Sequence, residues 1–275
     1  IYKELNVTFD FYAGESFYND KMQPVVEELR EKGLLKTSDG ASIVDLEEYG
    51  MPPCLILKSD GSSLYATRDI AAAIYRKNTY DFYKCLYVVA YQQNLHFKQF
   101  FKVIELMGKP WAKDLVHVAY GMVSMESGSM STREGKVVLL EDVISKTVEK
   151  AYKVIEEKNP NLKDKEKTAR AVGTGAVIFG ALCNNKIKDI VFSYDRVLSF
   201  EGETCPYLQY SVARCNSVLN KNEKAGAFTV SEMNDDEYQV ITILGRFGEA
   251  VLSAADKYDG SSTKTETGFA AGRMT

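Results

Sequence analysis

Tyr65 and Asp69 are the first pair of residues whose types and spacing suggest chemistry. They lie four positions apart where a helical pattern begins, so both side chains can point from one helix face into a common pocket. A carboxylate beside a phenol suits a cationic ligand, because Asp can bind a guanidinium through two hydrogen bonds. The alternative is that Asp69 caps the helix or forms a salt bridge with Arg68 or Arg76.

A second group of polar side chains, Gln93 and His96, follows the apolar run of residues 85–91. Such a run is typical of a strand buried in a parallel sheet, and parallel α/β sheets bind ligands outside the carboxyl ends of their strands. His117 and Gly121 lie at the next strand, where a glycine lets the backbone approach a flat ligand. The alternatives are a helix cap or surface position for Gln93 and His96, and a core position for His117.

The polar, basic segment 129–136 also follows a strand. It is not a P-loop, because six residues rather than four separate Gly128 from Gly135. Arg133 and Lys136 are the candidates for contacts to phosphate groups, with help from backbone N–H groups. A solvated basic loop is the alternative.

Tyr207, Tyr210 and Arg214 share one face of a predicted helix by their spacing. Aromatic rings with a nearby arginine can stack on unpaired bases and neutralise phosphate charge. Tyrosines at helical spacing are more often part of a protein core, and that alternative stays open.

The elements that position these residues divide the chain into two parts. The first part alternates strands and helices, which indicates an α/β layer fold: strands at 1–12, 41–46, 54–58, 85–91 and 115–120, and helices at 16–32, 67–77 and 95–107. Gly33 and Gly108 are expected to end two of the helices, and Asp60-Gly61 to form a turn. The second part shows almost no strand pattern, with helices at 143–158, 163–184, 206–220 and 235–258.

Bulk composition is that of a globular protein, with 275 residues, 45% of them hydrophobic and 26% charged. The net charge of −4 argues against attraction of the whole chain to nucleic acid, although local patches decide phosphate contacts. Five cysteines without a C-x-x-C spacing and two histidines argue against a zinc site and suit a reducing cytoplasm. The longest nearly apolar run, residues 172–183, is too short to span a bilayer. We expect a cytoplasmic monomer that does not enter membranes.

Together, the blocks at residues 60–71, 88–97, 129–136 and 200–214 resemble class I arginyl-tRNA synthetases, in that family's order. The resemblance covers roughly residues 1 to 258. It implies the second half of a Rossmann-type parallel-sheet catalytic domain in residues 1–142. A connecting and anticodon-binding region, an all-α helical bundle, is implied for 143–258. Residues 259–275 do not resemble the family and are expected to be a disordered tail.

The resemblance also implies a role for each block. Arginine would be bound by Tyr65, Asp69 and Gln93. The ATP side would consist of His96, His117, Gly121, Met122 and Val123. The catalytic loop would use Ser131, Thr132, Arg133 and Lys136, and the tRNA contacts would be Tyr207, Tyr210 and Arg214. The loop departs from the family's Lys-Met-Ser-Lys-Ser pattern, with Ser129 and Thr132 in place of lysines.

The implied activity is that of an arginine–tRNA ligase, which activates L-arginine with ATP to arginyl-adenylate and transfers it to tRNA-Arg. Magnesium would arrive with ATP, and no metal site on the protein is expected. The family's His-Ile-Gly-His block is absent, so we expect the isolated chain to be catalytically inactive. The alternatives are a non-catalytic tRNA-binding or regulatory fragment, and a different nucleotide-using α/β enzyme with a helical appendage.

Overall fold

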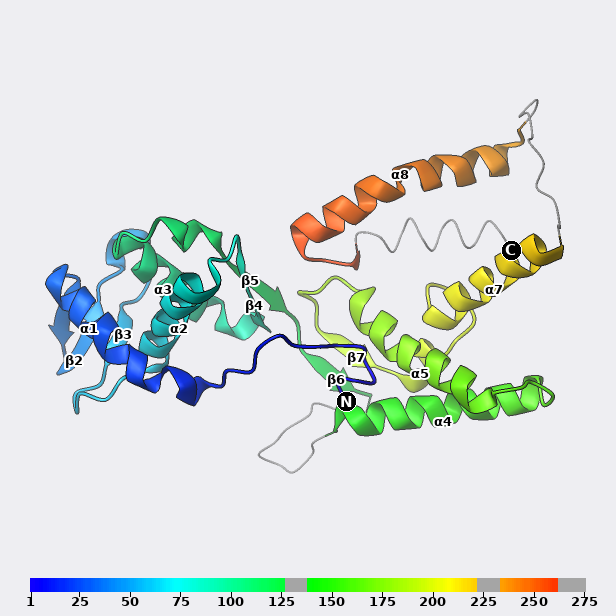
Figure 1. Cartoon of the computed structure of the whole chain (residues 1–275), viewed down its shortest axis with the longest axis horizontal. Helices are drawn as coiled ribbons and strands as arrows, with labels where there is room; N and C mark the ends of the chain where they lie inside the picture. The colour runs from blue at the N-terminus through cyan, green and yellow to red at the C-terminus, as the bar shows by residue number, and fades with distance from the viewer. Residues whose placement is uncertain (127–137, 222–232, 262–275) are drawn as a thin grey trace. The chain divides into compact units, whose positions relative to one another are not determined.

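The computed structural model describes residues 1–126, 138–221 and 233–261. Its contacts divide the chain into two units, residues 9–120 and residues 1–8 with 121–275. The first unit combines helices with strands, and the second is mainly helical (Figure 1). The expected α/β class with a helical part is confirmed. The functional boundaries expected at residues 142 and 258 stay a prediction.

The 9–120 unit contains a three-stranded antiparallel sheet and a parallel strand pair, with helices packed against both. Its elements in chain order are η1 (Glu15–Lys21), α1 (Met22–Glu31), β1 (Leu35–Ser38), β2 (Ala41–Val44), η2 (Glu47–Tyr49), β3 (Cys54–Leu57), α2 (Tyr65–Tyr80), β4 (Cys85–Ala90), η3 (Tyr91–Gln93), α3 (Asn94–Leu106), η4 (Pro110–Asp114) and β5 (Leu115–Tyr120), where η marks a 3-10 helix.

One apolar core holds these elements together. Leu29 of α1, Ile56 of β3, Ile70 of α2 and Phe100 of α3 are fully buried in it. Each comes from the apolar face of an amphipathic helix or strand, and removing that face from water is the main force that joins the layers. The core therefore fixes the starts of α2 and α3 relative to the sheet.

Two glycines end helices of this unit as the sequence predicts. Gly33 follows α1 with φ of 67°, its N–H bonds to the Arg30 carbonyl, and the Leu34 N–H bonds to that of Leu29. Gly108 follows α3 in the same way, with φ of 75°. The left-handed conformation lets the last helical carbonyls find donors, and glycine adopts it without steric cost.

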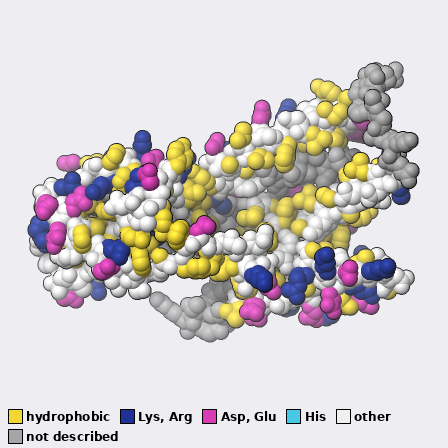
Figure 2. All heavy atoms as spheres, in the orientation of Figure 1, with side chains coloured by type: hydrophobic (Ala, Val, Ile, Leu, Met, Phe, Trp, Pro, Cys, Tyr) yellow, Lys and Arg dark blue, Asp and Glu magenta, His cyan; other side chains and the backbone are white. Residues whose placement is uncertain are grey.

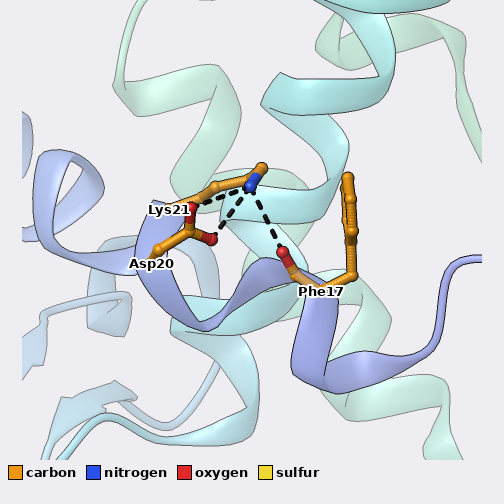
Figure 3. Close-up of polar contacts among 3 residues, drawn as sticks. All are labelled: Phe17, Asp20 and Lys21. Carbon is orange, nitrogen blue, oxygen red and sulfur yellow. Dashed lines mark hydrogen bonds and ion pairs between the residues drawn. The ribbon is translucent and has the colours of Figure 1, made fainter.

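The turn η1 is held to α2 by a lysine. Lys21 Nζ lies 2.9 and 3.1 Å from the two carboxylate oxygens of Asp20 and 3.2 Å from the Phe17 carbonyl oxygen (Figure 3). The same ammonium lies 4.4 Å from the centre of the Phe17 ring and 5.5 Å from that of Tyr75 on α2. Cation–π contacts of this kind add a modest attraction between η1 and α2.

β4 and β5 are parallel, as the alternation of strand and helix predicts, with Cys85 opposite Leu115 and Ala90 opposite Tyr120. The expected burial of β4 holds for one face only. Tyr87 points into the core, whereas Val88 on the opposite face is 65% exposed. A continuous apolar run therefore does not show whether one face of a strand or both faces are buried. Within the described residues, only one face of β4 is covered.

The unit of residues 1–8 and 121–275 is built on a packed pair of helices, α4 and α5. Its elements are β6 (Val123–Met125), α4 (Leu140–Lys158), α5 (Lys165–Leu182), β7 (Ile190–Phe192), α6 (Tyr194–Val197), α7 (Cys205–Lys221) and α8 (Asp235–Lys257). The four predicted helices are confirmed with ends shifted by a few residues. Figure 2 shows hydrophobic side chains at the surface along α8, where Tyr238, Ile241 and Leu244 are more than half exposed.

The strand predicted at residues 1–12 is wrong, and the short strands β1, β6 and β7 were not predicted. Residues 1–12 form turns and extended segments without strand pairing: Asn6 adopts a left-handed conformation with φ of 55°, and Leu5 packs against the apolar cluster of α4 and α5. Alternating side chains do not make a strand when no neighbouring strand is available to pair with. β7 was not predicted, and it exists as a short parallel partner of β6.

Candidate functional site

The start of α2 is tied to β3 by hydrogen bonds to a single carbonyl. Ile56 accepts from the Leu64 N–H at 3.2 Å and from the buried Thr67 hydroxyl at 2.5 Å. Before them, the predicted Asp60-Gly61 turn is confirmed, with the Asp60 carboxylate accepting from the Ser62 N–H at 2.8 Å. The first turn of α2, which carries Tyr65 and Asp69, is thus fixed against the sheet.

Asp69 is hydrogen-bonded to His96. The distance from His96 Nε2 to Asp69 Oδ2 is 2.6 Å, and the side chains are 24% and 38% exposed, respectively. Gln93 stands at the N-cap of α3, one turn before His96. The structure thus brings the starts of α2 and α3 together. Asp69, Gln93 and His96, which were predicted from the sequence as site residues, come from these two helix starts.

Arg68 and Arg76 are not the partners of Asp69. Arg68 Nη1 lies 2.6 Å from Glu15 Oε2, and the Arg76 guanidinium lies over the Tyr87 ring at 5.4 Å. The alternative of an Asp69 salt bridge to either arginine is therefore wrong in this structure. Burial raises the pKa of the Tyr87 phenol, so Tyr87 is uncharged beside Arg76 at neutral pH.

Tyr65 is accessible at the first position of α2, with 70% of its surface exposed. The Arg68 guanidinium lies 5.9 Å from the centre of its ring. Because Glu15 binds Arg68, the Glu15 carboxylate lies close to the predicted arginine site. Glu15 is not among the residues predicted from the sequence. Its contact spans 53 positions of sequence, and no local spacing connects Glu15 with α2.

His117 has the contacts of a structural histidine. Its Nε2 lies 2.9 Å from the Val89 carbonyl oxygen, and its ring stacks on Phe97 with centres 4.1 Å apart and planes at 21°. Since a carbonyl oxygen only accepts, Nε2 carries the proton. These contacts fit the core alternative, and a role beside ATP stays a prediction.

Gly121 is required by a close backbone approach. A Cβ at this position would lie 2.2 Å from the Lys188 carbonyl oxygen, and the Gly121 N–H donates to the Lys186 carbonyl at 2.7 Å. The neighbouring Met122 N–H donates to Asp189 Oδ1 at 2.7 Å, and Val123 begins β6. The chain segment around Lys188, rather than a flat ligand, accounts for this glycine.

In α7, the structure brings Tyr210 and Arg214 together. The Arg214 guanidinium lies 5.8 Å from the centre of the Tyr210 ring, and Tyr210 is 49% exposed. Tyr207 is half-buried, which fits the core alternative better than a base contact. The helix is anchored to α5 by Gln209, whose amide donates to the Ala171 carbonyl at 3.2 Å.

The predicted catalytic loop, with Ser131, Thr132, Arg133 and Lys136, lies outside the described residues, as does most of the expected tail at 259–275. Among the residues that are described, no three His, Cys, Asp or Glu side chains are grouped as metal ligands. In the same part of the chain, no helix is long and apolar enough to cross a membrane.

A cavity of about 570 Å³ lies in the helical unit, and none of the predicted site residues lines it. Its walls come from α5, α6, the segment between α6 and α7, and the start of α7, and they include Asp195, Arg196 and Glu201. A second cavity, of about 230 Å³ and almost wholly apolar, includes Val123 in its lining. The predicted arginine site therefore depends on the start of α2 and its neighbours, not on these cavities.

Comparisons with known proteins identify the family of the chain. The family model described as "tRNA synthetases class I (R), catalytic domain" matches residues 1–194. Arginine–tRNA ligases from Halothermothrix orenii and Clostridioides difficile are 57% and 55% identical over 265 and 260 residues, which are 95% and 94% of this chain but 47% and 46% of theirs. The chain thus spans about half the length of the curated relatives it matches.

Among solved structures, Thermus thermophilus arginyl-tRNA synthetase superposes with a TM-score of 0.89 at 26% identity, covering 99% of this chain and 52% of that one. Since the catalytic-domain model alone accounts for well over half of the residues, the chain belongs to the class I arginyl-tRNA synthetase family.

Proposed function

We propose that this chain serves arginine–tRNA ligation, in which ATP activates L-arginine to arginyl-adenylate and the arginyl group passes to tRNA-Arg. One observation carries the proposal beyond family membership. Asp69 lies near the start of α2, one turn after the exposed Tyr65, and its carboxylate is hydrogen-bonded to the His96 imidazole rather than paired with an arginine.

In this proposal, Asp69 binds the substrate guanidinium and the Tyr65 phenol lies against its side chain. A carboxylate and a guanidinium match in charge and in planar geometry, which selects arginine over lysine. Gln93 at the start of α3 supplies amide groups that can bind the polar end of the amino acid. These three side chains come from two helix starts that the 9–120 core holds in place.

No protein nucleophile is needed for the reaction. The arginine carboxylate attacks the α-phosphorus of ATP, and catalysis comes from alignment of the reactants and from cations near the developing phosphate charge. Part of that negative charge would be neutralised by magnesium bound with ATP. We assign the remaining cations to Arg133 and Lys136, and the ATP-side contacts to His117 and residues 121–123, whereas His96 contacts Asp69.

For tRNA, we propose α7 as a contact surface through Tyr210 and Arg214. An exposed ring beside a guanidinium offers stacking to a base and charge to a phosphate. Tyr207 is half-buried. We propose that it supports α7 and contacts tRNA only through the exposed edge of its ring. We further propose a monomer in the cytoplasm, which fits five cysteines that form no disulfide within the described residues.

The test is arginine-dependent exchange of pyrophosphate into ATP by this chain, with and without tRNA. Lysine is the control amino acid, and Asp69→Ala is measured in parallel. Exchange with arginine alone, lost in the variant, would support the full proposal. Binding of arginine and tRNA without exchange would limit the chain to recognition. Absence of both exchange and arginine binding would contradict the proposal.

A further inference from the structure

The hydrogen bond between Asp69 and His96 joins the start of α2 to the start of α3. His96 Nε2 and Asp69 Oδ2 are 2.6 Å apart, which is short for a nitrogen–oxygen hydrogen bond. The residues are 27 positions apart in sequence. The contact therefore depends on how α2 and α3 pack, and not on the local conformation of either helix.

His96 is held by its aromatic neighbours. Its ring centre lies 5.3 Å from that of Phe100, with the planes tilted by 45°, and 5.5 Å from that of Phe97 in an edge arrangement. Phe100 is fully buried in the core and Phe97 nearly so. An imidazole packed in this way loses little further freedom when it binds a partner, so it can fix the position of a carboxylate at low entropic cost.

The carboxylate keeps capacity for a ligand while it is held. The imidazole donates its Nε2–H to Oδ2, and a carboxylate has about four acceptor positions on its two oxygens. Within residues 1–126, 138–221 and 233–261, Oδ1 of Asp69 accepts no hydrogen bond from the protein. One oxygen is thus fixed by His96 and the other is available to a guanidinium.

We propose that His96 is a positioning residue for Asp69: its Nε2–H holds the carboxylate in the orientation that binds the guanidinium of arginine. The proposal rests on the assignment of Asp69 as an arginine ligand. It differs from the role on the ATP side that the sequence resemblance implies for His96. In this role, the affinity for arginine depends on the hydrogen bond that His96 donates and not on the size of its ring.

The first experiment observes the hydrogen bond itself. The chain has two histidines, so a long-range ¹H–¹⁵N spectrum of the imidazoles contains two sets of signals. We expect His96 to carry a proton on Nε2, the nitrogen that faces Asp69. In Asp69→Ala, His96 should change to a mixture of tautomers, while His117, bonded to a backbone carbonyl, should stay unchanged. A His96 spectrum that Asp69→Ala leaves unaltered would overturn the proposal without reference to arginine.

The second experiment measures the affinity for L-arginine by calorimetry in three variants. His96→Leu removes the donor and should weaken binding about tenfold or more, the usual loss for a hydrogen bond to a charged group. His96→Gln places an amide N–H near the Nε2 position and should restore most of the affinity. Lys98→Ala, an exposed position on the same helix, should bind as the unchanged chain does.

The outcomes separate the two proposals. If the unchanged chain binds arginine and His96→Leu binds it equally well, His96 has no positioning role, although Asp69 remains an arginine ligand. If Leu and Gln variants lose affinity alike, packing of the ring rather than its hydrogen bond is responsible, and the inference fails. If the unchanged chain binds no arginine, the arginine site itself is refuted, and His96 has no arginine ligand to position.

Discussion

Close packing of α5 on α4 depends on Gly173, and Gly173→Ala tests this directly. A Cβ at Gly173 would lie 2.7 Å from both the Cα and the backbone nitrogen of Val148, and 2.8 Å from its Cγ2. A comfortable carbon–carbon contact is about 3.5 Å. The two helices would therefore have to separate by roughly 0.8 Å, because a helix backbone cannot rotate aside as a side chain can.

The cost follows from the residues that share this interface. Overpacking of a close-packed interior costs about 1–3 kcal/mol, and contact with backbone puts Gly173→Ala near the upper limit. Alanine recovers about 1 kcal/mol by its better helix propensity. We expect a net loss of about 2 kcal/mol in the free energy of unfolding of the helical unit.

The assay is thermal unfolding followed by circular dichroism, with hydrogen–deuterium exchange to localise the effect. The midpoint should fall by about 4–8 °C, and exchange should accelerate in α4 and α5. Gly245→Ala is the matched control, since a Cβ there meets no atom within 4 Å, and it should leave α4 and α5 unchanged. A Gly173→Ala protein as stable as the unchanged chain would refute the argument from close backbone contact.

Three further predictions concern charge, thiol reactivity and tRNA. Asp69→Asn keeps the shape of the side chain and removes its charge, and should weaken arginine binding about 10- to 100-fold by calorimetry; Asp81→Asn, at the exposed end of the same helix, should not, and equal losses would exclude a specific role. Burial raises the pKa of the Cys54 thiol to about 12, so a thiol reagent at pH 8 should spare Cys54 in the folded chain and label the exposed Cys215; prompt labelling of Cys54 would show that the core opens. Arg214→Ala should lower the slope of log affinity for tRNA against log salt by about one, and an unchanged slope would remove Arg214 from the interface.

Much of the secondary structure was predictable because its causes are local. Gly33 and Gly108 end helices through their own left-handed conformation, and the Asp60-Gly61 turn closes through hydrogen bonds within a few residues. The strand expected at residues 1–12 failed because pairing is not a local property. The alternation of Leu5, Val7 and Phe9 is real, but no strand within the described residues pairs with it.

The candidate site shows the same difference between local features, which were predictable, and long-range contacts, which were not. Tyr65 and Asp69 were predictable as a pair, because four positions on a helix place two side chains on one face. Gly121 was predictable as a close approach, but not the segment that approaches it. The backbone around Lys188 is 67 positions away, and sequence spacing carries no information about such a distance.

The sequence by itself determined the helices, part of the strands, the family and the identity of the polar residues at the starts of α2 and α3. The tertiary structure decided which side chains pair: Asp69 is hydrogen-bonded to His96, and Arg68 forms an ion pair with Glu15. The physical reason is that periodicity and turn residues act within a few positions of the chain. Which carboxylate meets which cation or imidazole is instead set by the packing of α2 and α3 on a shared core, where each contact joins residues far apart in sequence.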